Sequence, residues 1–292
     1  MKRFALFGDP VGHSKSPRMH SAAYRALGWS HVYEARHVVP DALADAVDAV
    51  RRGELEGANV TVPHKERVLA FVDGVDATAR VIGAANTLVR TSDGKVIAHN
   101  TDAPALVDEF ADLGIRSGGN AVHALVLGAG GAARAAMFAL ARSGIIRTIE
   151  VRSRRFSDTH VARAFESELR DATGSVVVRA TELAPDVEAD RAIAIVVQAT
   201  SAGLGSHGAG SATDGGRTAV EALAWDALPD TAVVLDVVYA DAPTAFVSRA
   251  RARGLRAEDG RGMLARQAER AFELWFGESA PVGVMRRAID VT

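Results

Sequence analysis

The chain of 292 residues is long enough for two domains of ordinary size. Hydrophobic residues make up 48% of it and charged residues 24%, which excludes an intrinsically disordered protein. A net charge of -2 argues against a nucleic acid as partner, and the lack of cysteine excludes disulfides and thiolate metal sites. No apolar run reaches the roughly 20 residues that span a bilayer, and none near the N-terminus is long enough for a signal peptide. We therefore expect a cytoplasmic protein that binds neither nucleic acid nor membrane.

Short apolar runs alternate with stretches of helical period, a pattern that predicts βαβ units and mainly parallel sheets. In the first third of the chain we expect strands at 3–8, 31–38 and 57–62 and helices at 16–28 and 40–53. Ser16 is expected as the N-cap of the first helix, with Pro17 at its first position. A further helix is expected to begin at His64. Residues 87–90 and 95–100 are joined by Asp93-Gly94 and read as a hairpin.

The pattern restarts near Asp102, where we place a domain boundary. A helix at 104–114 is followed by a strand at 123–128, an alanine-rich helix at 132–144, and buried strands at 148–151, 191–200 and 231–239. Residues 205–218 have no apolar periodicity and are predicted to form a surface loop. The stretch 262–277 is an amphipathic helix with one apolar face, made of Leu264, Ala268, Ala271, Phe272 and Trp275.

A glycine-rich segment follows the strand at 123–128 and opens the alanine-rich helix. Gly128, Gly130 and Ala133 have the spacing of a dinucleotide-binding turn, with Gly131 as an additional glycine. In such a turn the backbone approaches a pyrophosphate, which lies at the helix N-terminus. The alternative is a turn whose glycines serve only the packing of helix on strand. Because strand, turn and helix are all predicted here, we favour the dinucleotide site.

The residues after the next strand indicate which nicotinamide cofactor is bound. Arg152, Ser153, Arg154 and Arg155 follow that strand, and guanidinium groups bind phosphate bidentately. Glu150 would favour a free 2′-hydroxyl, but the pattern places it within the strand. The cluster therefore favours NADP over NAD, with a solvated basic turn as the alternative.

Polar residues lie beside the predicted strand ends of the first domain, where open α/β sheets bind ligands. Ser14 and Ser16 are alternate hydroxyls after the first strand, and Asn86 and Asp102 lie near later strand ends. Lys65 is expected in the first turn of a helix, where unpaired backbone N–H groups create a positive field. A lysine there is misplaced for helix stability, which favours a role in proton transfer with Asp102 as its partner. Taken singly, the other residues could be helix caps or turn residues.

The segments "GHSKSP", "NVTVPHK", "GAANTL", "HNTD", "GAGGAARA", "ATSAG", "DVVY" and "GRGMLARQAERAFELWFG" occur in the order seen in shikimate dehydrogenases. The chain resembles that family from Phe7 to about Gly277. The resemblance implies an NADP-dependent oxidoreductase that interconverts 3-dehydroshikimate and shikimate in aromatic amino-acid biosynthesis, without a metal. The implied fold is α/β: an N-terminal substrate domain of residues 1–102, completed by 261–292, and a Rossmann domain of residues 103–260.

The resemblance also implies roles for single residues. Lys65 and Asp102 would be the catalytic acid–base pair. Substrate would be bound by Ser14, Ser16, Thr61, Asn86, Tyr239 and Gln267. Cofactor would be bound by Gly128, Ala129, Gly130, Gly131, Ala132, Arg152, Ser153, Arg154, Arg155, Thr200, Ser201, Gly260 and Met263.

The chain departs from the family pattern at Val151, Gln198, Leu204 and Ala240, none of which belongs to the acid–base pair. Three alternatives stay open: an NAD-dependent quinate/shikimate dehydrogenase, an aminoshikimate-type enzyme, and a non-catalytic regulator that binds shikimate. The chain is expected to be a monomer or a homodimer.

Overall fold

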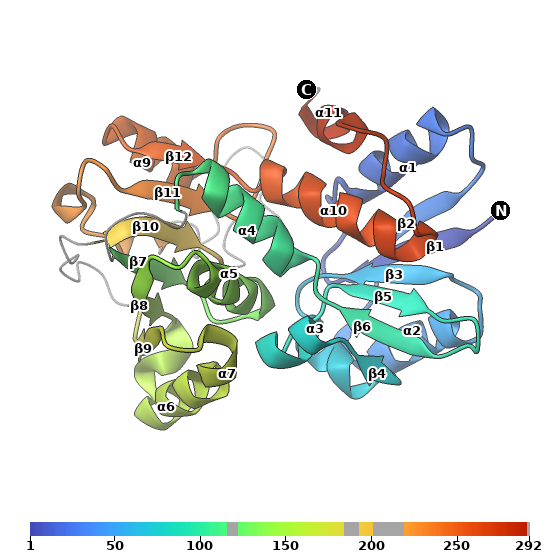
Figure 1. Cartoon of the computed structure of the whole chain (residues 1–292), viewed down its shortest axis with the longest axis horizontal. Helices are drawn as coiled ribbons and strands as arrows, with labels where there is room; N and C mark the ends of the chain where they lie inside the picture. The colour runs from blue at the N-terminus through green and yellow to red at the C-terminus, as the bar shows by residue number, and fades with distance from the viewer. Residues whose placement is uncertain (116–121, 184–192, 201–218, 291–292) are drawn as a thin grey trace. The chain divides into compact units, whose positions relative to one another are not determined.

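The computed structural model describes residues 1–115, 122–183, 193–200 and 219–290. The chain forms two compact units (Figure 1). The first comprises Met1–Ala105 together with Arg261–Thr292, and the second comprises Leu106–Gly260. The predicted loop at 205–218 lies outside the described residues. Within the described part of the chain, no helix combines the length and the apolar character needed to cross a membrane.

The first unit contains a six-stranded mixed sheet in the order β2-β1-β3-β5-β6-β4. Strand β1 pairs in parallel with β2 and β3, β5 is antiparallel to β3 and β6, and β4 is parallel to β6. The strands are β1 (Arg3–Gly8), β2 (Val32–His37), β3 (Gly57–Val60), β4 (Gly74–Val75), β5 (Thr87–Arg90) and β6 (Val96–His99). The helical segments are α1 (Ser16–Ala26), η1 (Pro40–Ala42), α2 (Leu43–Arg51), η2 (Arg67–Ala70), α3 (Ala77–Ile82), α10 (Arg261–Phe276) and α11 (Val284–Asp290). Helix α4 (Asp102–Asp112) begins in this unit and continues into the second one.

This pairing brings several loops to one edge of the sheet. Strands β1 and β3 are parallel and end at this edge, where β5 begins because it runs the opposite way. Asn59 faces Thr87, and Thr87 faces His99 at the end of β6. The segments after β1, β3 and β6 and the segment before β5 therefore meet there, although they are far apart in sequence.

Two predictions about helix starts are wrong. The expected helix at His64 is a turn that continues into the short 3₁₀ helix η2, which begins only at Arg67. Lys65 therefore lies before any helix, held by a bond from the Ala85 N–H to its carbonyl. Ser16 is the first residue of α1 rather than its N-cap, which is Lys15. The peptide before Pro63, in the Lys65 turn, is cis.

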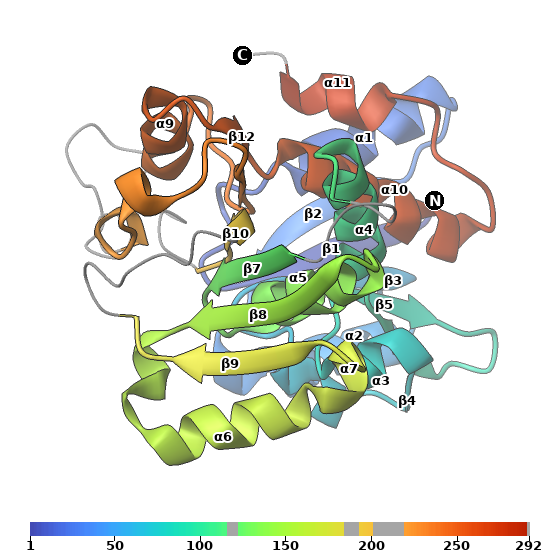
Figure 2. The same cartoon turned by 60° about the vertical axis from the view of Figure 1, so that its left-hand side comes forward.

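The second unit contains a parallel six-stranded sheet in the order β12-β11-β10-β7-β8-β9 (Figure 1 and Figure 2). This is the strand order of a Rossmann fold, whose ligand site lies where the order reverses, between β7 and β10. Its strands are β7 (Val122–Leu127), β8 (Ile146–Arg152), β9 (Val177–Thr181), β10 (Ile193–Gln198), β11 (Val233–Asp236) and β12 (Arg256–Glu258). Its helical segments are α5 (Gly131–Arg142), η3 (Arg154–Ser157), α6 (Thr159–Glu168), α7 (Arg170–Thr173), η4 (Trp225–Ala227) and α9 (Ala245–Ala252).

Helix α10 follows the second unit in sequence but belongs to the first. Its apolar face joins α1, α11 and β1 in a core that includes Met19, Tyr24 and Phe272. The indole of Trp275 donates to the Leu88 carbonyl of β5 at 3.0 Å. It occupies space that Gly57 leaves free, because a Cβ at Gly57 would lie 2.3 Å from the indole nitrogen. Helix α10 is thereby fixed against the sheet that carries the strand-end loops.

Candidate active site

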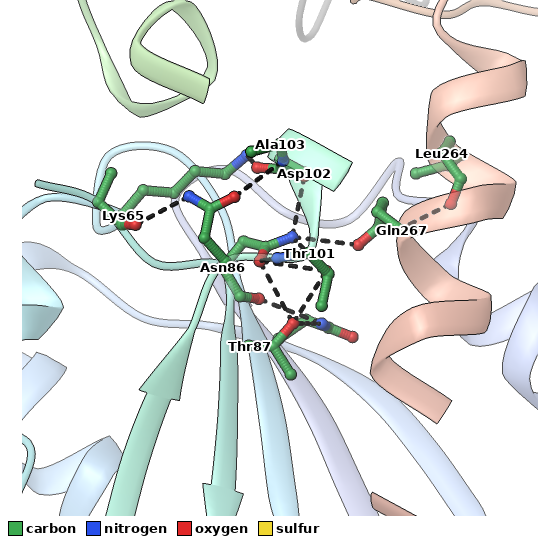
Figure 3. Close-up of polar contacts among 11 residues, drawn as sticks. Lys65, Asn86, Thr87, Thr101, Asp102, Ala103, Leu264 and Gln267 are labelled. Carbon is green, nitrogen blue, oxygen red and sulfur yellow. Dashed lines mark hydrogen bonds and ion pairs between the residues drawn. The ribbon is translucent and has the colours of Figure 1, made fainter. Parts of the chain in front are cut away.

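A buried ion pair lies at the edge of the first sheet where the loops meet. The Lys65 Nζ is 2.7 Å from Asp102 Oδ2, and the two side chains are 14% and 4% exposed (Figure 3). The predicted pair is thus present, although Lys65 lies in a turn. Separating the two groups would leave a buried charge without its partner, which costs free energy. Each group therefore holds the other in place.

Asn86 extends this pair into a network. Its Nδ2 donates to Asp102 Oδ1 at 2.9 Å and to Thr101 Oγ1 at 2.9 Å, and its Oδ1 accepts from the Thr101 N–H at 2.7 Å. Gln267 Oε1, on helix α10, lies 3.3 Å from the same Asn86 nitrogen. Figure 3 shows that the four predicted residues Lys65, Asn86, Asp102 and Gln267 come together.

The start of helix α4 explains why the Asp102 carboxylate is available to Lys65. Asn100 Oδ1 accepts from the Ala103 N–H at 2.9 Å, so a neighbouring side chain caps the helix. Asn100 is itself fixed by a bond from its Nδ2 to the Ala84 carbonyl at 2.8 Å. The capping role that the sequence left open for Asp102 therefore belongs to Asn100. The roles of Asn100 and Thr101 were not predicted from the sequence. Their position directly before Asp102 is the one feature that could have indicated them.

The two serines and Thr61 lie after strands that end at the same edge. Ser14 Oγ accepts from the Ser16 N–H at 3.2 Å and lies 3.2 Å from the Ser16 hydroxyl. The Thr61 N–H donates to the Phe7 carbonyl, and a Cβ at Gly8 would lie 2.4 Å from the Thr61 methyl group. Gly8 thus leaves room for the Thr61 side chain beside the end of β1.

The glycine-rich turn of the second unit has the features of a pyrophosphate site. Gly128 has φ +111°, and a Cβ there would lie 2.7 Å from the Ala199 carbonyl oxygen after β10. A side chain at this position is excluded by both its φ and its space. Gly130 is the N-cap of α5, whose first turn carries no acidic residue. Ala133 is fully buried, as expected where the helix packs closely on the sheet. These residues fit a dinucleotide.

The arginine cluster divides into a buried and an exposed part. Arg152 is the last residue of β8 and is fully buried, and its Nε lies 2.6 Å from Glu150 Oε1. Arg154 and Arg155 are exposed on η3. The Arg155 guanidinium donates to the Ala129 carbonyl at 3.4 Å, beside the glycine-rich turn. Ser153 is the N-cap of η3 and accepts from the Arg155 N–H. Of the three guanidinium groups, Arg154 and Arg155 are the ones accessible to a phosphate in this structure.

The remaining predicted residues lie in both units. The Thr200 N–H donates to Gln198 Oε1 at 2.6 Å at the end of β10, while Ser201 lies outside the described residues. Gly260 approaches the chain after β11 so closely that a Cβ there would lie 2.2 Å from the Val237 carbonyl oxygen. Tyr239 is half-buried in the segment after β11, and Met263 is buried in α10.

Asp236 is a buried acid that the sequence did not single out. It ends β11, accepts from the Val238 N–H at 3.0 Å, and accepts from the Thr244 hydroxyl at 2.7 Å. Burial raises its pKa from 3.8 to about 7, with a smaller contribution from the nearby Asp259. Through these two hydrogen bonds, Asp236 holds Val238 and Thr244, the two ends of the segment that carries Tyr239.

A Rossmann sheet with a glycine-rich turn, in a chain whose other unit carries a buried lysine–aspartate pair, defines a dinucleotide-dependent oxidoreductase. Two family models match the chain: the shikimate dehydrogenase substrate binding domain over residues 6–88 and the shikimate 5'-dehydrogenase C-terminal domain over residues 260–289. A shikimate dehydrogenase (NADP(+)) of Symbiobacterium thermophilum is 39% identical over 97% of this chain and 92% of its own length. The chain belongs to the shikimate dehydrogenase family, as its sequence predicted.

Solved structures give the same result for the fold. Shikimate 5-dehydrogenase from Thermus thermophilus, in complex with NADP(H) and shikimate, matches with a TM-score of 0.79 and 34% identity over 99% of this chain and 98% of that chain. A 5-ketofructose reductase of Gluconobacter sp. strain CHM43 matches with a TM-score of 0.79 and 29% identity over 98% and 97%. The predicted α/β fold class is confirmed.

Proposed function

We propose that this protein is an NADP-dependent shikimate dehydrogenase, which reversibly reduces 3-dehydroshikimate to shikimate. The observation that carries the proposal is the buried pair of Lys65 and Asp102, with Asn86 and Gln267 beside it. Relatives named as NADP(+) enzymes and a neighbouring structure with NADP(H) and shikimate support both the substrate and the cofactor. The same relatives favour this function over the NAD-dependent and regulatory alternatives.

The first unit is proposed to bind the substrate. Ser14 and Ser16 present two hydroxyl groups suited to a carboxylate, which accepts hydrogen bonds. Thr61, Asn86 and Gln267 supply donors and acceptors for ring hydroxyl groups. We assign Tyr239, from the second unit, to the substrate on the family resemblance.

The second unit is proposed to bind NADP. The segment from Gly128 to Ala132 would hold the pyrophosphate at the N-terminus of α5, where the helix dipole favours an anion. Arg154 and Arg155 would contact the 2′-phosphate, with Ser153 beside them, while Arg152 is buried at the end of β8 and paired with Glu150. Thr200, Ser201, Gly260 and Met263 are assigned to the cofactor on the family resemblance. Bound NADPH supplies the hydride for reduction of the ring ketone.

The chain's own contribution to the reaction is proton transfer. In reduction, the Lys65 ammonium donates a proton to the carbonyl oxygen as negative charge develops there, and in oxidation the neutral amine takes the proton back. Asp102 Oδ2 orients the ammonium, while its Oδ1 accepts from Asn86 and so cannot turn away. The Asp102 carboxylate can also accept a hydrogen bond from the substrate hydroxyl next to the reacting carbon.

Replacing Lys65 tests this assignment. Lys65→Ala is expected to lower kcat by about 10²–10⁴-fold, the usual contribution of a general acid–base group. Lys95→Ala is the matched control, because Lys95 also pairs with an aspartate, Asp93 at 2.9 Å, but in an exposed hairpin. The control should keep the kcat of the unmodified protein. Near-full turnover by Lys65→Ala would refute proton transfer by this residue.

We further propose that the enzyme acts in the cytoplasm as a monomer or homodimer. The lack of cysteine is consistent with a reducing compartment.

A further inference from the structure

A chain of buried hydrogen bonds leads from Asn86 into the interior of the first sheet. Its members are Thr87 on β5, Asn59 on β3 and Tyr33 on β2, which are 0%, 4% and 5% exposed. Asn59 and Thr87 face each other in the β3–β5 register. No proposed contact with substrate or cofactor uses these three side chains. A buried polar group lowers the stability of the fold unless it forms hydrogen bonds, so the partners of each of these groups matter.

The side-chain hydrogen bonds among Tyr33, Asn59 and Thr87 all have their donors oriented toward Thr87. The Tyr33 hydroxyl donates to Asn59 Oδ1 at 2.7 Å, which leaves the amide nitrogen of Asn59 pointing the other way. That nitrogen donates to Thr87 Oγ1 at 3.0 Å and to the Asn86 carbonyl at 3.1 Å. Because Thr87 accepts from Asn59, its single proton is available to Asn86 Oδ1 at 3.3 Å or Thr101 Oγ1 at 3.2 Å.

The orientation of the Asn86 amide follows from its two fixed neighbours. The Thr101 N–H can only donate, so it requires the amide oxygen, and the Asp102 carboxylate can only accept, so it requires the amide nitrogen. The Thr87 hydroxyl reinforces the same orientation. With the Thr87 proton on Asn86 Oδ1, each donor in the series points toward Asp102, and aligned hydrogen bonds in a buried chain strengthen one another.

The Tyr33 end of the chain is held by packing. The Tyr33 ring stacks on His20, with ring centroids 4.2 Å apart and an interplanar angle of 8°. His20 is fully buried in helix α1, four residues after Ser16. The phenol therefore cannot rotate freely away from Asn59, and the first donor of the series is fixed.

We propose that Tyr33, Asn59 and Thr87 are positioning residues, which orient the Asn86 amide and through it the Asp102 carboxylate that pairs with Lys65. We call the hydrogen-bond chain from Tyr33 through Asn59 and Thr87 to Asn86 the relay. The inference rests on the proposed function, because the relay is expected to affect substrate binding and proton transfer. A hydrogen-bond chain that served stability alone would have no influence on either. The last hydrogen bond of the relay, from Asn86 Nδ2, is accepted by the Asp102 carboxylate that pairs with Lys65. A positioning role requires such a bond to the groups that react.

Thr87→Val tests the proposal, because it replaces the hydroxyl with a methyl group of the same shape. We expect kcat/KM for shikimate to fall about tenfold, the effect of losing one buried hydrogen bond that orients the site. The KM for shikimate should rise, because Asn86 is proposed to bind a substrate hydroxyl. The pH at which kcat is half-maximal should move, and Thr87→Ser should restore the original values. Tyr33→Phe, which removes the first donor alone, should change the same quantities in the same direction.

Thr173→Val is the matched control. Thr173 is buried in the second unit and its hydroxyl donates to the Leu169 carbonyl at 3.0 Å, so the change removes a comparable bond away from the site. It should lower the melting temperature and leave KM and the pH profile unchanged. If Thr87→Val and Tyr33→Phe behave like this control, the relay serves stability only and the proposal is wrong. Should Thr87→Val fail to fold, Tyr33→Phe alone decides the question. The unmodified protein is assayed first, so a failure of the proposed function appears there as absent turnover and is not confused with a failure of the relay.

Discussion

Asp236 is a single residue whose burial gives the stability of this protein a defined dependence on pH. Its folded pKa is raised to about 7 from 3.8 because its charged form loses solvation at the end of β11. Between those two values the folded state holds a proton that the unfolded chain releases. The free energy of unfolding therefore decreases as pH rises from about 4 to about 7, by up to about 1.4 kcal/mol for each pH unit.

Asp236→Asn should remove this contribution, because an amide does not ionise. We expect the gain in stability of the variant over the unmodified protein to grow as pH rises from about 4 to about 7, measured by urea unfolding at each pH. His20 acts in the opposite direction, since burial lowers its pKa to about 3 and stability is lost as pH falls from 6.5. Because His20 is present in both proteins, its effect cancels in the difference. A difference that stays constant over this pH range would contradict the buried charge at Asp236.

Sequence reasoning at the residue level found the reacting groups but not their surroundings. Lys65 and Asp102 were predicted as a pair, although Lys65 was placed in a helix that does not exist there. The residues that orient the pair were invisible, because Asn59 and Thr87 meet only through the register of two strands. Arg152 was grouped with its exposed neighbours, since its burial depends on where β8 ends.

At the level of elements, the close packing of α10 against the sheet at Gly57 predicts that a larger residue there destabilises the protein. Gly57→Ala introduces a methyl group that would lie 2.3 Å from the Trp275 indole nitrogen and 2.8 Å from the Leu88 carbonyl oxygen. Overpacking of this kind usually costs about 1–3 kcal/mol. We therefore expect a lower melting temperature and, because α10 carries Gln267, a higher KM for shikimate.

Gly12→Ala is the control for this substitution, because a Cβ at Gly12 has no neighbour within 4 Å. Its effect on stability should stay within about 0.5 kcal/mol. Equal melting temperatures for the two variants would mean that α10 does not depend on the space at Gly57.

The elements that could be predicted are those with a long periodic pattern. The helices α1, α2, α5 and α10 and the strands β7, β8, β10 and β11 all overlap the expected ranges. Although α6 with ten residues was also missed, the missed elements are mostly short, such as β4 with two residues, β12 with three and α3 with six. Segments of this length carry too little periodicity to be recognised, and tertiary pairing decides their structure.

For the whole molecule, the order of motifs indicated the family, and the comparisons confirm it. The two units divide after Ala105 and after Gly260. The local pattern indicated the first of these boundaries, near Asp102, whereas the second came from the family resemblance. The return of α10 to the first unit came from the family resemblance and not from the amphipathic pattern, which is compatible with packing on either unit.

The most direct test of the account is the initial rate of the purified protein with shikimate or quinate and with NADP or NAD, followed at the absorbance of the reduced cofactor. We expect the highest kcat/KM for shikimate with NADP, at least about tenfold above NAD, the factor produced by about 1.4 kcal/mol of phosphate contact. Binding of shikimate and NADP without any rise in absorbance, or a clear preference for NAD, would contradict the account.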